Sequence, residues 1–417
     1  MFFLYNCIVF LAGKVIQGIA FFSPKLHLFV EGRKNVFSIL QQKIQPHDKT
    51  IWFHAASLGE FEQGLPVIEE LKKKFPQKKI IVSFFSPSGY EVRKNNTIAD
   101  ATVYLPLDTI KNVKTFLDIV HPEMVFFIKY EFWPNYLNEL KKRQIKTYLI
   151  SGIFRKNQAF FKWYGSFYRK ALHAFDYFFV QNESSKNLLH NLQFTNVKVS
   201  GDTRFDRVTA ILERENRLDF IEEFLQDNAL NNTIVIGSSW PKDEKLLIPF
   251  INKAPQHLKF IIAPHNIKPD LIASLRNQIT QKTVLYSEKD NTNLASYNVL
   301  IIDTIGLLTK IYSYADIAYV GGGFGSPGVH NILEPATFGV PIIIGPNYSH
   351  FAEATALVHA KGCTSVTNEE ELNDAFWTLL HNEDIRLEQG HICATFVQMN
   401  KGATARITAH ILNETLK

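Results

Sequence analysis

The chain has 417 residues, of which 46% are hydrophobic and 20% are charged, and its formal net charge is +5 at pH 7. This length exceeds what one hydrophobic core usually supports, so we expect two domains, and the even composition excludes long low-complexity or repetitive tracts. The mild positive charge suits an anionic substrate or a membrane surface without demanding nucleic acid, and the three scattered cysteines favour free thiols over a disulfide framework or zinc knuckle.

The first segment, residues 1–30, is rich in Phe, Leu, Ile and Val and is followed by Arg33 and Lys34. Lys14 divides it into two apolar runs, each too short for a comfortable membrane span of about 20 residues. The first residues carry no basic side chain, which disfavours a cleaved signal peptide. We therefore expect a membrane-associating segment that inserts its apolar face, while basic side chains reach anionic head groups. An ordinary buried helix is the alternative.

Downstream, short apolar runs rich in β-branched residues alternate with helical patterns, which predicts repeated strand–helix units and parallel sheets. The first series of predicted strands is 51–54, 79–85, 102–105, 124–128, 146–150 and 177–180. Helical periodicity between them covers 61–75, 109–120 and 135–143. The second series of predicted strands is 233–236, 258–262, 299–302, 317–320 and 341–344.

The two series predict two Rossmann-like domains, 31–205 and 206–395, followed by a C-terminal helix, 396–417, that could pack back on the first domain. A charged helix is expected at 212–226, near the boundary. Two such domains would face each other across a cleft, with ligands at the carboxyl ends of the strands. Neither domain carries G-x-G-x-x-G after its first strand, which disfavours a nicotinamide dehydrogenase.

The first strand of the first domain runs into residues 54–60, which end in Glu60 at the start of a helix. Glu60 is a candidate general base, because the positive end of the helix keeps its carboxylate ionised and Gly59 leaves room for an acceptor hydroxyl. Ser57 and Glu60 also fit an S-x-x-E capping box, in which the same carboxylate would serve the helix start. From the residues alone, both interpretations stay open.

Two further segments of this domain carry charge. Residues 129–135, after the fourth strand, combine Glu131 with aromatic rings, a mixture that suits sugar binding but also occurs as plain packing beside Pro134. Arg204, within 201–206, lies at the predicted hinge, where its guanidinium could pair with an anionic donor or form an interdomain salt bridge.

The second domain offers two candidate positions behind its first two strands. Gly237, Ser238 and Ser239 follow a strand and precede a helix, so their N–H and hydroxyl groups could hold a phosphate, or a serine could simply cap the helix. His265 ends the next strand, where a lone histidine could touch a ligand or be structural.

Residues 321–335 form a glycine-rich loop that leads into a helix, a surface suited to phosphate and sugar hydroxyls. Gly322 and Gly323 would let backbone N–H groups approach an anion, and Glu334, in the first turn, could accept from two ribose hydroxyls. Asn331 and Glu334 also fit an ordinary N-x-x-E cap. No third ligand supports a metal site at this loop, so we predict none.

Together these motifs resemble glycosyltransferase family 30, the 3-deoxy-D-manno-octulosonic acid (Kdo) transferases. The motifs occur in family order at 54–60, 104–108, 131–135, 181–183, 201–206, 321–334 and 345–346. The resemblance implies a GT-B fold with an acceptor-binding first domain and a donor-binding second domain. It further implies inverting transfer of Kdo from CMP-Kdo to a lipid A precursor, in lipopolysaccharide biosynthesis at the cytoplasmic face of the inner membrane, without a cofactor or nucleic acid.

The resemblance also implies roles for single residues. Glu60 matches the catalytic base, and Glu131 matches the acidic residue of an E-x-W-P motif on the acceptor side. The implied donor-binding residues are Arg204, Gly237, Ser238, Ser239, His265, Gly322, Gly323, Asn331 and Glu334. The chain departs from relatives at Lys129, Ile153 and Pro264. The rival functions are another GT-B enzyme, such as a UDP-sugar transferase or a nucleotide-sugar epimerase, and a non-catalytic membrane-bound scaffold.

Overall fold

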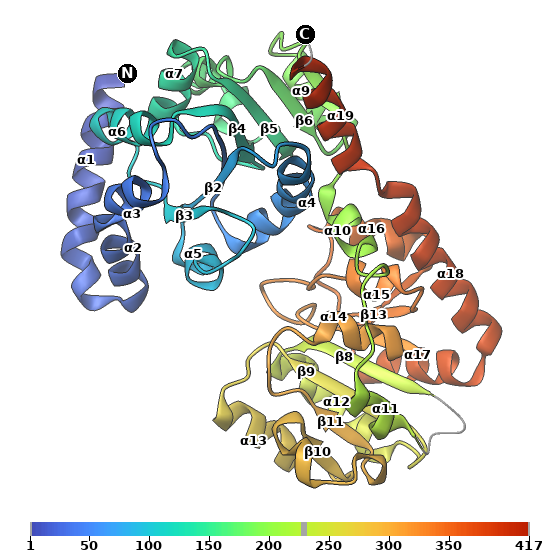
Figure 1. The fold of residues 1–417 in the computed structure, drawn as a ribbon. Coiled ribbons are helices and arrows are strands. Elements are labelled where there is room, and N and C mark those ends of the chain that lie inside the picture. The colour runs from blue at the N-terminus through green and yellow to red at the C-terminus, as the bar shows by residue number, and fades with distance from the viewer. Residues whose placement is uncertain (1, 227–231, 416–417) are drawn as a thin grey trace. The chain divides into compact units, whose positions relative to one another are not determined.

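The structure is a computed structural model, and it describes residues 2–226 and 232–415. The chain divides into two compact units: unit 1 comprises Met1–Arg207 and Lys401–Lys417, and unit 2 comprises Val208–Asn400. Each unit contains one seven-stranded sheet whose paired strands are all parallel (Figure 1). The predicted α/β class with two parallel sheets is confirmed.

The sheet of unit 1 has the strand order β3-β2-β1-β4-β5-β6-β7. Its strands are β1 (Thr50–Ala55), β2 (Lys79–Phe84), β3 (Ala101–Tyr104), β4 (Pro122–Ile128), β5 (Lys146–Gly152), β6 (Tyr177–Val180) and β7 (Val197–Val199). The order reverses between β1 and β4, which opens a crevice at the carboxyl ends of these two strands. All six residues of β1 are buried, because helices cover both faces of the sheet.

The helices of unit 1 lie on both faces of this sheet. They are α3 (Val36–Lys43), α4 (Leu58–Lys74), α5 (Pro87–Arg93), α6 (Ile110–Val120), α7 (Pro134–Lys142), α8 (Ser166–Leu172), α9 (Glu183–His190) and α19 (Ala403–Thr415). Helix α19 lies beside β6, and its Ile407 and Ile411 join the core that contains Phe179 (Figure 1). The Tyr148 hydroxyl donates to Glu414 at 2.7 Å and holds the end of α19 on the sheet.

The sheet of unit 2 has the order β10-β11-β9-β8-β12-β13-β14. Its strands are β8 (Thr233–Ser239), β9 (Lys259–Pro264), β10 (Thr283–Leu285), β11 (Val299–Ile301), β12 (Ile317–Val320), β13 (Ile342–Ile344) and β14 (Cys363–Ser365). Its helices are α11 (Asp219–Leu225), α12 (Pro241–Lys253), α13 (Pro269–Gln278), α14 (Leu308–Ile311), α15 (Leu333–Thr337), α16 (Ala352–His359), α17 (Glu369–His381) and α18 (Glu383–Asn400). Here the order reverses between β8 and β12, which sets the ends of these strands as the switch point.

Two helix predictions were wrong. The helix expected at 212–226 begins only at Asp219, because the preceding backbone is held in turns: Asn216 donates to Ile211 O, and Leu218 N–H donates to the Tyr314 hydroxyl. The single helix expected from 396 to the C-terminus is two helices, α18 and α19. Gly402, at φ 99°, separates them, since this left-handed conformation suits glycine. Residues 416–417 lie outside the described residues.

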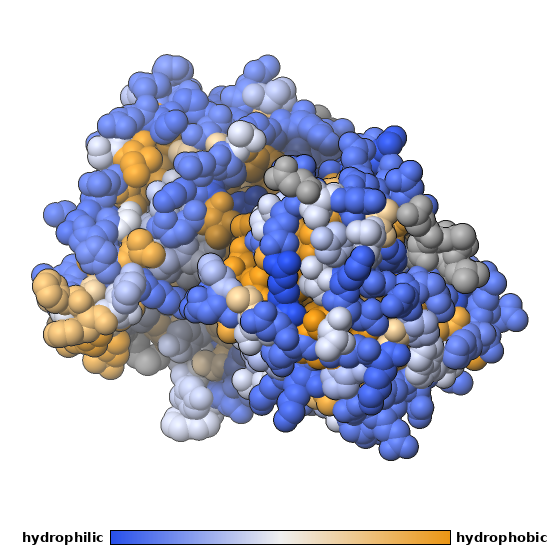
Figure 2. Space-filling model, turned by 90° about the horizontal axis from the view of Figure 1, so that it is seen from below, coloured by the Kyte–Doolittle hydropathy of each residue, from blue (hydrophilic) through white to orange (hydrophobic). Residues whose placement is uncertain are grey.

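The N-terminal segment forms two helices, α1 (Phe2–Ile19) and α2 (Pro24–Lys34), joined by the short turn Ala20–Phe22. Within the described residues, Phe2–Phe22 is the single stretch long and apolar enough to cross a membrane, judged by length and composition alone. Figure 2 shows hydrophobic side chains gathered at the left edge of the view, the side on which α1 and α2 lie in Figure 1.

Candidate functional site

Glu60 lies in the first turn of α4, directly after β1. Its Oε2 accepts a hydrogen bond from the backbone N–H of Ala56 at 2.5 Å, so the carboxylate points back toward the end of the strand. The side chain of Ser57 makes no capping hydrogen bond. The predicted capping box is therefore incomplete, and Glu60 is held at the crevice end of β1.

The surroundings of Glu60 make it a stronger base than an ordinary glutamate. Burial and then the negative charge of Glu131 raise the pKa of Glu60 to about 7, against the lowering effects of the Ala56 N–H and of Lys129. A carboxyl group that titrates near neutral pH can both hold and release a proton there, which is the property a general base needs.

Glu131 follows β4 and is held by two ring N–H groups. Its Oε2 lies 2.9 Å from Nε2 of His54, a fully buried residue of β1, and accepts from the indole N–H of Trp133 at 2.8 Å. An ionised carboxylate offers only acceptors, so the proton between Glu131 and His54 belongs to Nε2 of the histidine. Glu131 is 8% exposed, and its contacts fix the direction of its charge.

The other side of the His54 ring is equally well partnered. Ser83 Oγ accepts from the Trp52 indole N–H at 2.7 Å, which leaves the serine proton to be donated to His54 Nδ1 at 2.8 Å. Nδ1 also lies 3.1 Å from the carbonyl oxygen of Ser83. Both ring nitrogens of His54 therefore have hydrogen-bond partners.

Basic groups gather around Tyr130, next to Glu131. Lys129, at φ 69°, places its ammonium 5.2 Å from the centre of the Tyr130 ring, and the Arg155 guanidinium lies 5.7 Å from it. Burial raises the pKa of Tyr130, while Arg155 and Arg204 oppose that rise. Three cations thus lie near one aromatic ring.

Arg204, in the short helix α10 (Thr203–Thr209), pairs with Asp202 directly before that helix. Its Nε and backbone N–H each donate to the carboxylate of Asp202 at 2.9 Å. Both members of this pair belong to unit 1. The roles predicted for Arg204, a pair with an anionic donor or a salt bridge between domains, stay predictions. The Asp202 partner fixes the guanidinium next to the group of charges around Tyr130.

In unit 2, the predicted phosphate loop lies at the end of β8. Ser238 adopts a left-handed conformation, φ 54°, and Ser239 Oγ donates to Glu244 at 2.9 Å. A Cβ atom at Gly237 would collide with the hydroxyl of Tyr312. The glycine is thus needed for close packing at the strand end, in addition to any role in binding.

Asp243 joins this loop to the glycine-rich loop. It is fully buried, and its carboxylate accepts from the backbone N–H groups of Trp240 and Gly322 and from the Tyr319 hydroxyl, each at 2.9 Å. The N–H group of Gly322 therefore already has an acceptor. Gly322 can contribute to anion binding only by letting the backbone come close to the anion.

The glycine-rich loop folds by backbone packing. Gly322 has φ 93°, a Cβ at Gly321 would collide with Ser238 O, and a Cβ at Gly323 would lie 2.7 Å from Gly345 Cα. Side chains at these positions would push the loop away from its neighbours.

Three rings stack beside the loop. His265 lies parallel to both Trp240 and His330, with ring centres 4.5 Å apart in each pair. The Trp240 indole N–H donates to His330 Nε2 at 2.8 Å, which places the His330 proton on Nδ1 in the neutral ring. Burial lowers the pKa of both histidines, so the stack is uncharged at neutral pH.

Glu334 is partnered through both carboxylate oxygens. Asn331 Nδ2 and Thr309 Oγ1 donate to them, each at 3.0 Å, and α15 begins only at Leu333. The Asn331 side chain accepts from Leu333 N–H at 3.2 Å, but the N-cap of α15 is Ile332, so the predicted N-x-x-E cap with Asn331 as its first residue is wrong. Pro335 lies within the first turn of α15, where a proline removes no hydrogen bond of the helix.

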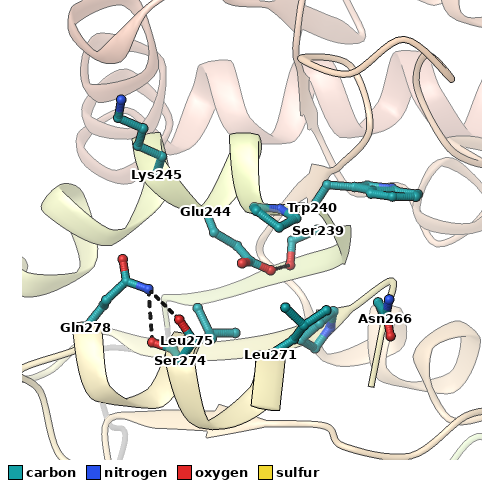
Figure 3. Close-up of a pocket in the computed structure, with 11 residues that line it drawn as sticks. Ser239, Trp240, Glu244, Lys245, Asn266, Leu271, Ser274, Leu275 and Gln278 are labelled. Atoms are coloured by element: carbon teal, nitrogen blue, oxygen red, sulfur yellow. Dashed lines mark hydrogen bonds between the residues drawn. The ribbon is translucent and has the colours of Figure 1, made fainter. Parts of the chain in front are cut away.

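A cavity of about 380 Å³ opens beside Ser239 (Figure 3). Ser239 and Glu244 face each other on one side, and Leu271 and Leu275 of α13 lie on the other. The Trp240 ring points away from Gln278 at the far end. Both units thus carry polar groups at the carboxyl ends of their central strands, the position expected for ligands in parallel sheets.

Each unit also places at its strand ends residues that the sequence predictions did not include: His54 and Trp133 in unit 1, and Trp240, Asp243 and His330 in unit 2. The position of His54 in the sequence could have indicated this residue. It lies at the carboxyl end of β1, and Glu131 follows the end of the neighbouring strand β4. Within the described residues, no cluster of three or more His, Cys, Asp or Glu side chains could hold a metal ion.

Comparisons with known proteins identify the family to which the chain is similar. The family model for "3-Deoxy-D-manno-octulosonic-acid transferase (kdotransferase)" matches residues 31–207. The chain is 30% identical over 390 residues to the 3-deoxy-D-manno-octulosonic acid transferase of Chlamydia trachomatis serovar D, covering 91% of this chain and 88% of that protein. It is 28% identical over 376 residues to the enzyme of the same name from Chlamydophila psittaci, covering 88% and 86%.

Solved structures bear out the GT-B fold. UDP-GlcNAc 2-epimerase from Neisseria meningitidis has a TM-score of 0.61 at 16% identity, covering 88% of this chain and 100% of that one. MurG from Acinetobacter baumannii has a TM-score of 0.54 at 14% identity, covering 88% and 99%. At these identities the likeness concerns the fold alone.

Proposed function

This chain belongs to the 3-deoxy-D-manno-octulosonic-acid transferase family of glycosyltransferases, and we propose that it transfers Kdo from CMP-Kdo to a lipid A precursor with inversion at the anomeric carbon. The observation that carries the chemistry is the position of Glu60 directly after β1, where the Ala56 N–H holds its carboxylate and where burial and Glu131 raise its pKa to about 7. Glu60 is a base of suitable strength at the crevice end of β1.

In the proposed reaction, an acceptor hydroxyl oxygen attacks the anomeric carbon of Kdo. Its proton passes to the Glu60 carboxylate, a new carbon–oxygen bond forms, and the bond to the phosphate breaks so that CMP leaves with the electron pair. Glu131 acts on the acceptor side, where its fixed charge keeps Glu60 basic. The transition state resembles an oxocarbenium ion, so the main requirement is to stabilise the departing phosphate and exclude water.

The donor-binding role falls to unit 2. The proposed contacts to the nucleotide come from Gly237, Ser238, Ser239, His265, Gly322, Gly323, Asn331 and Glu334. Asp243 supports them, since it holds the loops after β8 and β12 together. Kdo also carries a carboxylate, and the cations Arg204 and Arg155 near Tyr130 are suited to it.

We place the enzyme at the cytoplasmic face of the inner membrane, associated through residues 1–30. Support comes from α1, on which large apolar side chains such as Phe3, Leu11 and Val15 are 82%, 61% and 58% exposed. A soluble monomer rarely leaves such a continuous apolar surface in water.

Donor identity and lipid product test this function together. CMP should protect the protein against heat more than UDP does, because a ligand stabilises only the state that it binds. Incubation with CMP-Kdo and a lipid A precursor should yield a lipid heavier by one or more Kdo units in mass spectrometry. Preferential protection by UDP, together with an unchanged lipid, would instead favour a UDP-sugar enzyme of the same fold.

A further inference from the structure

Arg33 is a partly buried cation without an acidic partner. It lies in the last turn of α2, and its guanidinium donates to three backbone carbonyl oxygens, those of Phe29, Phe85 and Leu105, at 2.8, 2.6 and 2.9 Å. Within the described residues no Asp or Glu forms an ion pair with Arg33, and the ionisable side chains that act on its charge are two tyrosines. Burial lowers the pKa of Arg33 to about 9, because the cation has lost water without gaining an anion.

The position of this guanidinium is fixed by the rings around it. Its carbon lies 3.6 Å from the centre of the Phe29 ring and 4.9 Å from that of the Tyr104 ring. A Cβ at Gly32, directly before Arg33, would collide with the Tyr104 ring, so the glycine lets α2 pack closely on the edge strand β3. The three carbonyl groups need three of the five N–H groups of the arginine, which leaves two for a ligand.

Arg33 lines a cavity between α1, α2 and the start of α6 (Figure 1). The cavity has a volume of about 210 Å³, less than the roughly 300–1,000 Å³ of pockets that enclose a whole drug-sized ligand. It therefore suits one substituent of a larger molecule. Its polar lining comes from Arg33, Lys34, Gln17 and Asn112, its other lining residues are apolar or glycine, and none of the described lining residues is acidic.

The groups around the cavity favour an anion with several acceptor oxygens. Asn112 lies in the first turn of α6, an eleven-residue helix capped by the Thr109 side chain, so the positive end of this helix also borders the cavity. Lys34 pairs with Glu31 at 2.6 Å, but both side chains are exposed and the pair is weak. A phosphate group, with three acceptor oxygens and up to about two negative charges, matches a guanidinium, an ammonium and amide donors together.

One residue, Phe85, connects this cavity with the crevice in which Glu60 lies. Phe85 directly follows β2, and its carbonyl oxygen accepts from Arg33. Its ring centre lies 4.7 Å from that of Trp133, and its backbone N–H donates to Ala55, the last residue of β1. The next N–H along the chain holds the carboxylate of Glu60. An anionic group at Arg33 can therefore belong to the same acceptor molecule as the hydroxyl group at Glu60.

We propose that this cavity binds a phosphate group of the acceptor lipid and that the Arg33 guanidinium recognises it. This assignment rests on the proposed function, because it names the group of the acceptor that the enzyme recognises. A phosphate held at this point orients the acceptor so that its hydroxyl group stays within reach of Glu60. Arg33 is thus a specificity-determining residue of the acceptor side, separate from the cations around Tyr130.

The test compares two acceptors that differ only in phosphate. A phosphorylated lipid A precursor, dispersed in detergent, is used as such and after removal of its phosphate by a phosphatase. The ratio of kcat/KM for the first acceptor to kcat/KM for the second measures recognition of phosphate, and any loss of folded enzyme cancels from this ratio. The ratio should be at least about tenfold in wild type, the effect of one hydrogen bond to a charged group, and should fall toward unity in Arg33→Gln.

Gln17→Glu tests the cavity without removing Arg33. Gln17 is an exposed residue of α1 that lines the cavity, and glutamate has nearly the same shape. The new carboxylate should repel a phosphate, so the ratio should fall several-fold while the three carbonyl contacts of Arg33 are kept. Gln42→Glu, an exposed change of the same kind on α3 and outside the cavity lining, is the matched control and should leave the ratio at its wild-type value. An unchanged ratio in both Arg33→Gln and Gln17→Glu would overturn the proposal.

Binding measurements keep this site apart from the enzymatic proposal. In calorimetry, wild type should bind the phosphorylated acceptor more tightly than the dephosphorylated one, and Arg33→Gln should bind both alike. Phosphate-dependent binding without transfer of Kdo would leave the site standing and refute the proposed reaction. Transfer with equal kcat/KM to both acceptors would refute the site and leave the reaction standing.

A competition experiment identifies the source of the phosphate. Detergent micelles that contain phosphatidylglycerol should not displace the phosphorylated acceptor from wild type, because a phosphodiester offers fewer free oxygens and less charge than the proposed ligand. Displacement that occurs in wild type but not in Arg33→Gln would assign the cavity to a bulk lipid head group and refute recognition of the acceptor.

Discussion

His54 Nε2 and Glu131 Oε2 lie 2.9 Å apart at the ends of neighbouring strands, and the histidine is completely buried. This pair keeps the negative charge of Glu131 close to Glu60, and the Glu131 carboxylate receives its own hydrogen bonds. Two acidic residues near each other would normally share a proton, but here the His54 and Trp133 N–H groups stabilise one as the anion. The other, Glu60, is left as the group that titrates near neutral pH.

Glu131→Gln should move the acid limb of the pH profile of kcat/KM to lower pH. The amide removes the charge that helps to raise the pKa of Glu60, so that pKa falls and Glu60 stays ionised in more acidic solution. Carbon NMR of the Glu60 carboxyl should show the same shift without substrate. Glu123→Gln, an exposed position paired with Lys78, is the matched control and should leave the profile unchanged. A profile of Glu131→Gln identical to wild type would remove Glu131 from this role.

Glu60 should also make stability depend on pH. Its folded-state pKa, about 7, lies above the ordinary glutamate pKa of 4.5, so the folded protein holds this proton more tightly than the unfolded chain. The associated stability is complete below about pH 4.5 and is lost as pH rises toward 7. Glu60→Gln should thus be more stable than wild type at pH 8, by on the order of 2 kcal/mol, with a smaller difference at pH 5. Urea unfolding at both pH values measures this, and equal differences would contradict it.

Asp243→Ala should destabilise unit 2 and weaken nucleotide binding together. The change leaves three buried donors without their acceptor, at a cost of at least about 2 kcal/mol. Asp243→Asn should be milder, because the amide oxygen can accept both N–H groups while the Tyr319 hydroxyl turns to accept from the amide. Thermal unfolding with and without CMP checks this order, with the exposed Asp219→Asn as control. If Asp243→Ala were as stable as wild type, contacts other than those of Asp243 would hold the two loops together.

Gly237→Ala should lower the melting temperature because its methyl group meets the Tyr312 hydroxyl. Tyr312→Phe removes that hydroxyl, so the double variant should be more stable than the sum of the two single changes predicts. The ring carbon below the hydroxyl, Cζ, would still lie 2.8 Å from the new methyl, and recovery should therefore be partial. Strict additivity would show that the strain at Gly237 comes from elsewhere.

Much of the fold follows from local patterns. The central strands were predicted within a few residues because they are buried on both faces and read as continuous apolar runs. The three strands that were missed, β7, β10 and β14, are three-residue strands at sheet edges, where a sequence such as Cys363–Ser365 carries no apolar run. The predicted helix boundaries were wrong where side chains such as Asn216 donate hydrogen bonds to backbone carbonyl groups.

The candidate site was less accessible to sequence reasoning. Positions after strand ends indicated Glu60, Glu131 and the glycine-rich loop, since ligands gather there in parallel sheets. Partners distant in sequence could not be read from local spacing. The pairing of Asp243 with Gly322, for example, depends on β8 and β12 being neighbours.

The decisive measurement is turnover of CMP-Kdo by Glu60→Gln in the presence of the lipid acceptor, alongside CMP binding by calorimetry. Glu69→Gln, on the same helix, is the matched control. Glu60→Gln should lose at least about a hundredfold in kcat, as expected when a general base is removed, and should bind CMP as wild type does. Near-normal turnover by Glu60→Gln would contradict its role as the base that receives the acceptor proton.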